Sequence, residues 1–198
     1  SGPIGRLVDR HYLDSVGWQG IRQRKRHLEE LLRKAMDALT CAGHPIRLLD
    51  IAAGHGRYAL EALAGYPRRP EAIVLRDFSE INVNQGTALI REKDLQDIKK
   101  KKKGDAFDRE SVAAVQPTPT IGIVSGLYEL FPDNDMVCRS LAGMADAIEP
   151  GGYLVYTGQP WHPQLELIAR ALTSHRGGQA WVMRRRTQAE MDQLVAEA

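Results

Sequence analysis

Residues 46–58 of this chain read as a buried strand that leads through a turn of small residues into a helix. The apolar stretch ends at Asp50, and Ala52, Gly54 and Gly56 then leave almost no side-chain volume in the turn. Such a turn lets the backbone approach a ligand closely. A strand, a tight turn and a helix in this order are the first unit of a parallel α/β sheet, so this segment constrains the fold more than any other.

The acidic residue beside the turn narrows the choice of ligand. The spacing Gly54-x-Gly56-x-x-Ala59 alone also matches a dinucleotide-binding fingerprint, which makes it a weak signal. The charge of Asp50, however, would lie where a pyrophosphate belongs, whereas its carboxylate can accept hydrogen bonds from an ammonium or a ribose. The combination predicts an adenosyl ligand that carries an amino acid, namely S-adenosylmethionine, and disfavours NAD(P).

Further along the chain, apolar runs that suit buried strands alternate with segments of helical periodicity. We expect strands at 46–51, 72–75, 121–124 and 153–156, and helices at about 20–40, 57–64, 79–93, 136–148, 163–174 and 187–197. Because the strands are apolar on both faces, this alternation predicts an α/β fold with a doubly wound, mainly parallel sheet and helices on both faces. Residues 1–44 are expected to form an N-terminal helical extension or lid, and residues 45–198 the S-adenosylmethionine-binding domain.

The run Lys99–Lys103 stands where the alternation requires a further strand. It has no apolar face, so we expect a solvated edge strand or a loop. A nucleic-acid patch is not supported, because no aromatic residues are interleaved with the lysines and the formal net charge of the chain is only +2.

Polar and acidic residues follow the predicted strands at the point where each strand ends, which is the edge at which open parallel sheets bind ligands. Asp77 follows Gly56 by 21 positions, a spacing that suits a ribose diol at the tip of the neighbouring strand. Asp105 follows the lysine run, and residues 125–129 and 159–162 follow the last two strands. Together with the carboxylate beside the turn, these acidic residues are expected to converge on one rim.

This set of motifs resembles the class I S-adenosylmethionine-dependent methyltransferases, and the resemblance covers about residues 46–160. It implies that the turn and the acidic residue before it hold the methionine part of the cofactor and that Asp77 binds the ribose hydroxyls. It also implies that Asp105, in the Gly-Asp-Ala-Phe segment at 104–107, lies near the exocyclic amine of the adenine. The implied cofactor-binding residues are Asp50, Ala52, Gly54, Gly56, Asp77, Phe78, Asp105, Ala106, Phe107 and Ser125.

A narrower resemblance rests on residues 122–132, GIVSGLYELFP. They are similar to a little-characterised group of bacterial methyltransferases whose members are sometimes fused to an α/β-hydrolase domain. Two features depart from the wider family. Ala52 replaces the first glycine of the turn, and no antiparallel strand pair is evident before Ala198, so we expect the last strands to be missing from this sequence or the sheet to be shortened.

The acceptor side is expected beyond the last two strands. Methyl transfer from a sulfonium requires alignment of donor and acceptor, and a base only if the acceptor must lose a proton. The candidates for acid–base work are Glu129, Tyr128 and His162, and those for substrate contact are Trp161, Gln159, Trp18 and Arg22. We expect Tyr128, Glu129, Trp161 and His162 to line one pocket. Surface pairing, a pocket wall or a packing anchor is the plainer interpretation of individual members of this set.

The composition fits one globular domain, with 43% hydrophobic and 26% charged residues in 198. Cys41 and Cys138 lie far apart without metal-ligand spacing, and no apolar run is long enough to span a bilayer, so we expect a reduced, cytoplasmic protein. The resemblance predicts methyl transfer to a small-molecule or lipid-like acceptor rather than to nucleic acid. Three alternatives stay open: an aminopropyltransferase-like enzyme, an NAD(P)-binding oxidoreductase and a non-catalytic adenosyl-binding domain.

Overall fold

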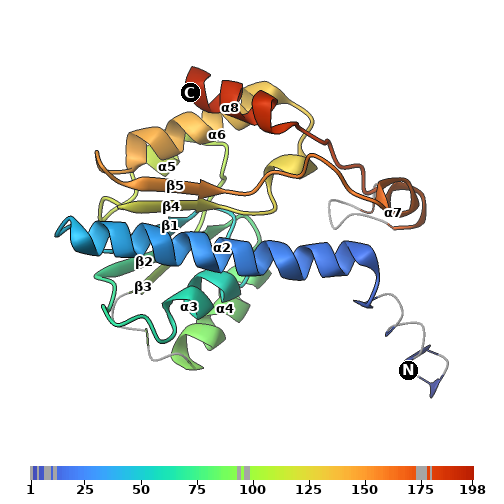
Figure 1. The fold of residues 1–198 in the computed structure, drawn as a ribbon, viewed down its shortest axis with the longest axis horizontal. Coiled ribbons are helices and arrows are strands. Elements are labelled where there is room, and N and C mark those ends of the chain that lie inside the picture. Colours follow the sequence, from blue (N-terminus) through green and yellow to red (C-terminus); the bar gives the residue numbers. More distant parts are fainter. Residues whose placement is uncertain are drawn as a thin grey trace.

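The computed structural model describes residues 2, 3, 5, 6, 10, 13–92, 95, 99–172, 178 and 180–198. Its centre is a five-stranded sheet in the order β3-β2-β1-β4-β5, in which every pair of neighbouring strands is parallel (Figure 1). The strands are β1 (Arg47–Asp50), β2 (Ala72–Asp77), β3 (Lys99–Lys103), β4 (Ile121–Val124) and β5 (Tyr153–Tyr156). The strand order reverses between β1 and β4, so their carboxyl ends form the switch point at which open α/β sheets bind ligands.

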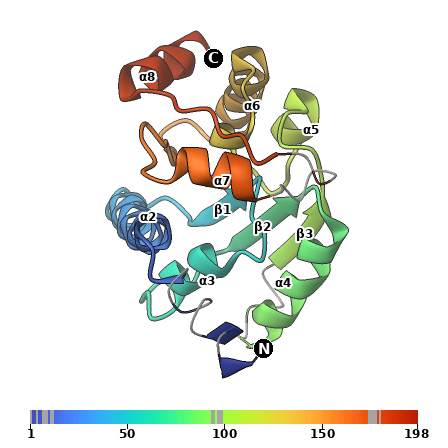
Figure 2. The same ribbon diagram turned by 90° about the vertical axis from the view of Figure 1, so that its right-hand side faces the viewer.

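Helices cover both faces of this sheet, which confirms the predicted doubly wound α/β fold. On one face lie α2 (Val16–Cys41), α3 (Arg57–Leu63) and α4 (Glu80–Glu92), and on the other lie α5 (Arg109–Ala113), α6 (Asn134–Ala147) and α8 (Gln188–Glu197) (Figure 1, Figure 2). A short 3₁₀ turn, η2 (Tyr128–Leu130), follows β4. The helix α7 (Leu165–Ala171) lies beyond the carboxyl ends of the strands (Figure 1).

The central strand β1 shows why the sheet is buried on both sides. Leu48 belongs to the hydrophobic cluster that includes α2 and α3, whereas Leu49 belongs to the cluster that includes α6 and α8. On α2, Leu28, Leu32 and Met36 repeat at helical spacing and pack into the first of these clusters. The stripe of apolar residues on α2 therefore holds this helix against the sheet.

The lysine run forms the edge strand β3, as one of the two sequence interpretations expects. Among the described strands it pairs only with β2, in a register that sets Lys103 beside Asp77. Gly104 N–H continues the ladder by donating to the carbonyl oxygen of Asp77 at 3.2 Å. Lys102 and Lys103 are exposed, and charged side chains on an edge strand oppose pairing with another chain.

Some element boundaries differ from the sequence prediction. The short helix α5 was not predicted; Asp108 caps it by accepting a hydrogen bond from Ser111 N–H at 3.0 Å. The helix α6 begins two residues early, because Asp133 accepts from Asp135 N–H at 2.8 Å and caps it there. The helix α7 starts later than predicted, and its predicted end at Ser174 lies outside the described residues, as does the predicted end of α4 at Lys93.

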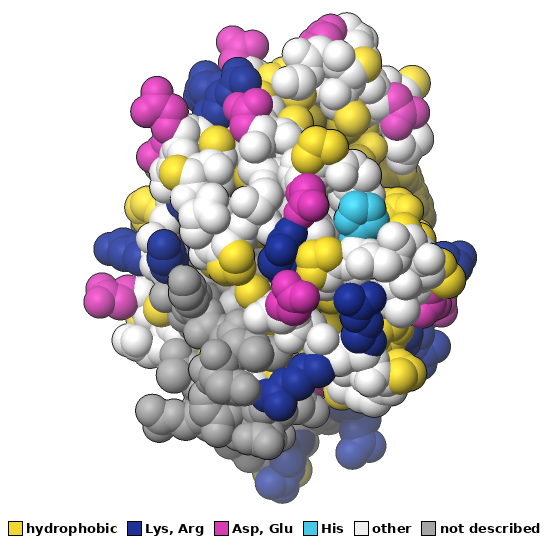
Figure 3. Space-filling view, turned by 90° about the vertical axis from the view of Figure 1, so that its left-hand side faces the viewer, with side chains coloured by type: hydrophobic (Ala, Val, Ile, Leu, Met, Phe, Trp, Pro, Cys, Tyr) yellow, Lys and Arg dark blue, Asp and Glu magenta, His cyan; other side chains and the backbone are white. Residues whose placement is uncertain are grey.

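Figure 3 shows the end of the molecule at which the strands begin. On the described part of this face, acidic and basic side chains are interspersed with apolar ones rather than gathered into one basic patch. Arg47 forms ion pairs here with Glu149 and, at 3.8 Å, with Glu71. None of the described helices is long and apolar enough to cross a membrane.

Candidate functional site

The turn after β1 has a backbone geometry that its small residues permit. Gly54 and Gly56 have φ angles of 53° and 71°, a region that favours glycine. Gly56 N–H donates to the carbonyl oxygen of Ala53 at 2.7 Å and closes the turn at the start of α3. A Cβ at Gly56 would lie 2.0 Å from Leu75 Cδ1, whereas a Cβ at Gly54 would meet nothing within 4 Å. The turn is therefore packed on the side of Gly56 and open on the side of Gly54.

Asp50 supports the turn from within the core. The residue is 0% exposed, and its carboxylate accepts hydrogen bonds from Ala52 N–H at 3.3 Å and from the Tyr58 hydroxyl at 2.5 Å. Burial first, and then the negative charge of Asp50, raise the pKa of Tyr58 well above its usual value. The carboxylate has no exposed surface in this structure, and its contact with an ammonium stays a prediction. Its visible role is to fix the turn.

The carboxylate of Asp77 joins β2 to the same turn. Its Oδ2 accepts a hydrogen bond from Gly54 N–H at 2.8 Å, while its Oδ1 accepts from Ser79 N–H at 2.8 Å and from Asn82 Nδ2 at 3.0 Å. The structure thus brings Asp77 and the glycine turn together on one rim, where Phe78 is 74% exposed. Asn82 was missed; its position three residues after the predicted helix start at Ser79 is the signal that could have found it.

Residues 104–107 reach this rim from β3. Asp105 is exposed, and its Oδ1 accepts a hydrogen bond from Phe107 N–H at 2.9 Å. The half-buried ring of Phe107 meets Phe131 edge-on, with 4.5 Å between ring centroids. Ala106 is buried in the cluster that includes α6, and its predicted place along the adenine stays a prediction. Asp105 and Phe107 stay accessible to a ligand.

A buried arginine beneath the rim was not predicted. Arg76 is 3% exposed and donates to the carbonyl oxygen of Ser111 and, at 2.7 Å, to Ser111 Oγ. Burial lowers its pKa, and the charges of Asp108 and Asp105 partly compensate. Gly104 leaves the space that the guanidinium needs, because a Cβ there would lie 2.3 Å from Arg76 Nη2. The signal in the sequence is an arginine inside an otherwise apolar strand.

Beyond β4, the backbone is tied to the end of β5. Gly126 N–H donates to Thr157 Oγ1 at 2.9 Å, and Ser125, predicted to contact the cofactor, is half-buried beside it. The guanidinium of Arg24, from α2, lies close to Gly126, since a Cβ at Gly126 would be 3.2 Å from Arg24 Nη2. Arg24 was not predicted, and it proves to connect α2 with the ends of the central strands.

Glu129 lies on η2 and is only 6% exposed. Its Oε1 accepts a hydrogen bond from Arg24 Nη1 at 2.8 Å, which forms an ion pair between segments 105 residues apart. Its Oε2 is buried and has no hydrogen-bond partner among the described residues. A buried carboxylate oxygen without a donor is costly, so this atom marks a place where a donor group is expected.

Tyr128, the residue before Glu129, points into the core. It is 2% exposed, and its hydroxyl donates to Ser140 Oγ of α6 at 3.1 Å. Arg186, 3% exposed, holds this turn by donating to the carbonyl oxygens of Tyr128 and Phe131 at 2.7 Å and 2.8 Å and to Asn134 Oδ1 at 2.9 Å. The hydroxyl of Tyr128 is thus bound to α6, and an acid–base role for Tyr128 stays a prediction.

The ring of His162 is held by a backbone hydrogen bond. Its Nδ1 accepts from Gln164 N–H at 3.1 Å, so a neutral ring carries its proton on Nε2. Burial, followed by the charge of Arg24, lowers the pKa of His162 and favours that neutral ring. The ring lies against α2, where a Cβ at Gly17 would be 3.4 Å from Nε2, and Gly17 N–H donates to Gln164 Oε1 at 3.1 Å.

A groove of about 690 Å³ opens between the first half of α2 and the segment that joins β5 to α7; we call it the α2 groove. Its α2 wall consists of Val16, Gly17, Gln19, Gly20, Ile21, Gln23, Arg24, His27, Leu28 and Leu31, and its other wall of residues 156–163. The predicted substrate residues Gln159 and Trp161 line it together with His162, whereas Glu129 lies behind Arg24.

Two predicted substrate residues lie outside the α2 groove. Trp18 is half-buried and Arg22 is exposed, and neither lines it. Arg22 Nη1 instead donates to the carbonyl oxygen of Leu13 at 2.8 Å. Because residues 18 and 22 are one helical turn apart, they share a side of α2, and the groove is lined by a neighbouring side that includes Ile21 and Arg24.

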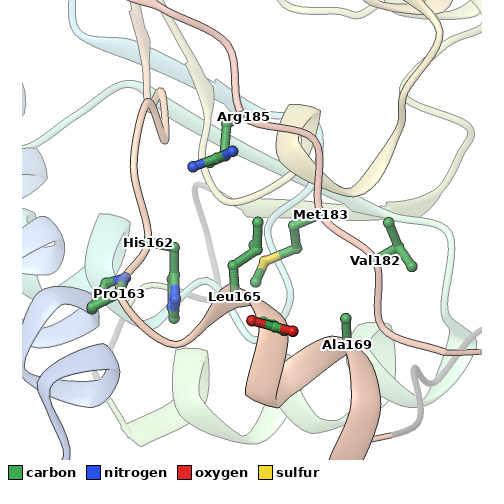
Figure 4. Close-up of a pocket in the computed structure, with 8 residues that line it drawn as sticks. His162, Pro163, Leu165, Ala169, Val182, Met183 and Arg185 are labelled. Carbon is green, nitrogen blue, oxygen red and sulfur yellow. The ribbon is translucent and has the colours of Figure 1, made fainter.

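A smaller cavity of about 320 Å³ lies between α7 and residues 182–185. Figure 4 shows Leu165 rising from α7 toward Met183 of the opposite segment, with His162 and Val182 on either side. His162 lines both this cavity and the α2 groove. His162 and Pro163 therefore border both hollows.

The whole chain, residues 1–198, matches a protein family described as "Putative methyltransferase". It is also 57% identical over 198 residues to the uncharacterized protein YnbC of Escherichia coli (strain K12). That similarity covers 100% of this chain and 34% of YnbC, so the chain spans about a third of the length of this relative.

Solved structures share the fold at low sequence identity. A possible exported protein from Bordetella parapertussis superposes with a TM-score of 0.69 and 19% identity, over 89% of this chain and 60% of that one. A SAM-dependent methyltransferase from Geobacter sulfurreducens, in complex with S-adenosyl-L-homocysteine, superposes with a TM-score of 0.51 and 19% identity, over 73% of this chain and 53% of that one. At these identities the similarity concerns the fold alone.

Proposed function

The chain belongs to the family of putative methyltransferases, and from this premise we propose that it transfers the methyl group of S-adenosylmethionine to a small-molecule or lipid-like acceptor. Its parallel sheet with helices on both faces is the Rossmann-like fold of class I methyltransferases. One observation carries the proposal: the glycine turn after β1 is open beside Gly54 and is joined there to the carboxylate of Asp77.

The exposed rim suits an adenosyl cofactor. The open side of the turn at Ala52 and Gly54 would receive the methionine part, since no side chain occupies that space. Asp77 would accept from the ribose hydroxyls, because a carboxylate oxygen that already receives one hydrogen bond keeps capacity for another. Phe78, 74% exposed, and Phe107 would border the adenine, with Asp105 near its amine.

The remaining predicted cofactor residues are proposed to act indirectly. Asp50 and Gly56 would keep the shape of the turn, Ala106 would support the rim from the core, and Ser125 would border the site at the end of β4. This division is part of the proposal: the contacts of Asp50 hold the turn and Ala106 packs in the core, whereas Asp77, itself only 9% exposed, binds Gly54 N–H on the open side of the turn.

Methyl transfer from S-adenosylmethionine requires little acid–base catalysis by the protein. The bound cofactor supplies a methyl group on a positively charged sulfur, ready for in-line displacement. The residues of this chain would align the acceptor and exclude water around it. If the acceptor must lose a proton, Glu129 Oε2 is the proposed base, because this oxygen has no hydrogen-bond partner among the described residues while Arg24 donates to Oε1.

Two alternative functions, an aminopropyltransferase-like enzyme and a non-catalytic adenosyl-binding domain, stay open. A contact of Asp50 with an ammonium would separate S-adenosylmethionine from its decarboxylated form, and since Asp50 is 0% exposed in this structure, an aminopropyltransferase-like enzyme stays the nearest alternative. A non-catalytic adenosyl-binding domain also fits, since methyl transfer requires no obligatory side chain. An NAD(P)-binding oxidoreductase is disfavoured by Asp50, whose charge lies directly below the turn where a pyrophosphate would bind, and by Asp105 in the segment that follows β3.

The cellular context is a separate proposal. We propose a reduced, cytoplasmic setting, which the free Cys41 and Cys138 support. An association with an α/β-hydrolase domain, suggested by the resemblance of residues 122–132, is likewise a proposal. Neither bears on the binding test that follows.

The sharpest test fills the space beside Gly54. Gly54→Val should abolish or weaken binding of S-adenosylhomocysteine by at least about 100-fold in a calorimetric titration, because the new side chain would occupy the place of the methionine part. Gly65→Val is the matched control, since Gly65 also has a positive φ, 78°, and a Cβ there also meets nothing within 4 Å.

Both variants place a side chain in a left-handed conformation, so each should lose a similar amount of stability, about 1–2 kcal/mol in urea unfolding. Equal affinities in the two variants would contradict the proposed cofactor site. A loss of binding in Gly54→Val alone would support it.

A further inference from the structure

The α2 groove has the size and position of a small-molecule site. Its volume of about 690 Å³ falls within the range of roughly 300–1,000 Å³ that is usual for ligand pockets. Arg24 lines the groove, donates a hydrogen bond to Glu129 and lies close to Gly126, which follows β4. One end of the groove therefore reaches the edge of the sheet at which the cofactor is proposed to bind.

Apolar side chains stand exposed on both walls of this groove. Ile21 and Leu31 of α2 are 41% and 48% exposed, and Trp161 on the opposite wall is 66% exposed. Single exposed apolar residues are ordinary on a protein surface. Three that line one groove form an apolar patch, and covering such a patch with a ligand is favourable because it removes apolar surface from water. An apolar molecule of matching width would cover them.

The ionisable groups of the groove are cations or hydrogen-bond donors. Among the described residues that line it there is no aspartate or glutamate, and its ionisable side chains are Arg24, His27, His162 and Tyr156. Arg24 is fixed by its hydrogen bond to Glu129 and, at 31% exposed, keeps part of its guanidinium at the surface. His162 in its neutral form offers Nε2–H. A ligand oxygen that carries negative charge complements these donors, and at Arg24 it would share the guanidinium with Glu129.

We propose that the α2 groove is the acceptor site and takes an apolar molecule that carries a carboxylate, with the carboxylate at Arg24 and the apolar part between Leu31 and Trp161. This inference rests on the proposed function. Methyl transfer would then form a bond from the methyl carbon to a carboxylate oxygen and break its bond to sulfur, which keeps the electron pair. The acceptor is already deprotonated, so no proton has to be removed in this reaction.

Three probes with the same ten-carbon chain separate charge from apolar contact: decanoate, 1-decanol and decyltrimethylammonium. Each is titrated below its micellar concentration into the protein saturated with S-adenosylhomocysteine, and also into the protein alone. Decanoate should bind at least about tenfold more tightly than either other probe. Equal or tighter binding of the cationic probe, or no binding of decanoate, would overturn the proposal.

Two variants locate the binding. Leu31→Asp places a carboxylate on the apolar wall and should weaken decanoate about tenfold or more, whereas Leu167→Asp changes a leucine that is 58% exposed and lines neither hollow, and should change nothing. The double variant Arg24→Gln/Glu129→Gln removes both charges of the ion pair together. It should reduce the preference for decanoate over 1-decanol while leaving the affinity of 1-decanol within about twofold.

The two proposals fail in different ways. If the cofactor site is wrong, S-adenosylhomocysteine does not bind, whatever the probes do. If the acceptor site is wrong, S-adenosylhomocysteine binds normally, but Leu31→Asp and Leu167→Asp give the same decanoate affinity. Arg22→Gln adds a charge control from the same helix, because Arg22 does not line the groove.

Discussion

Asp77 Oδ2 accepts a hydrogen bond from the backbone N–H of Gly54 at 2.8 Å, and this contact joins the end of β2 to the turn that follows β1. The two residues are 23 positions apart, yet they define one corner of the rim. The carboxylate is held in place from its other side by Ser79 N–H and Asn82. A ligand that meets Asp77 therefore meets a group whose position is already fixed.

Asp77→Ala should weaken the binding of S-adenosylhomocysteine by about 1.5–3 kcal/mol, the usual worth of a hydrogen bond to a charged group. The ribose hydroxyls would lose their acceptor, and the turn would lose its anchor. Calorimetric titration measures the effect. Asp146→Ala, which removes a carboxylate from the outer surface of α6, is the control and should leave the affinity unchanged. An unaltered dissociation constant in Asp77→Ala would place this residue outside the site.

Tyr128→Phe should alter the pH dependence of stability above about pH 10. Burial raises the pKa of Tyr128 in the folded protein above the unfolded value of about 10. Its contribution is therefore fully present below that pH and falls as pH rises toward the folded pKa. The difference in unfolding free energy between the native protein and Tyr128→Phe, from urea titrations at pH 8 to 11, should decrease with pH. A constant difference would contradict the buried environment of the phenol.

Arg186→Met should destabilise the protein by about 2–4 kcal/mol, because one buried and two part-buried oxygen atoms would lose the hydrogen bonds that Arg186 donates. Arg185→Met is the control. Arg185 is exposed next to it, so its replacement should cost less than about 0.5 kcal/mol. Urea unfolding compares the two. Similar losses in both variants would mean that Arg186 does not hold the turn that carries Glu129.

Arg24→Met should cost about 1–3 kcal/mol of stability, because the buried carboxylate of Glu129 would lose its counter-charge while Arg24 itself is partly exposed. Adding Glu129→Gln should recover most of this loss, since the variant no longer buries an unpaired charge. Unfolding measurements on the two single variants and the double variant give the coupling free energy. Additive effects would show that the pair does not interact.

Glu129→Gln alone should leave the affinity for S-adenosylhomocysteine within about twofold, because Glu129 is proposed to act on the acceptor side. The same calorimetric titration as for Asp77→Ala makes the comparison direct. A loss as large as that of Asp77→Ala would assign Glu129 to the cofactor site instead.

The strands and the glycine turn were predictable because their signals are local. β1, β4 and β5 are apolar runs between breaks, and the turn is a run of small residues. The helix α5 was missed because five residues carry no helical periodicity, and only the cap at Asp108 marks it. β3 lacks an apolar face, so its position was predicted from the alternation of strands and helices rather than from its own residues.

The acceptor side was less predictable because it depends on how distant segments pack. Tyr128 and Glu129 are adjacent in the 3₁₀ turn η2, but the side chain of Tyr128 contacts α6 and that of Glu129 contacts α2. The direction of a short irregular turn cannot be read from its composition. Arg24 was missed for a related reason, since its importance follows from the contact of α2 with η2 and not from any motif in α2 itself.

The most direct test of the account is a calorimetric titration of the native protein with S-adenosylmethionine, S-adenosylhomocysteine and NAD under identical conditions. The open turn at Gly54, with the carboxylate of Asp50 below it, predicts that both adenosyl ligands bind at micromolar concentration and that NAD does not bind detectably. Micromolar binding of NAD without binding of S-adenosylhomocysteine would contradict the central claim.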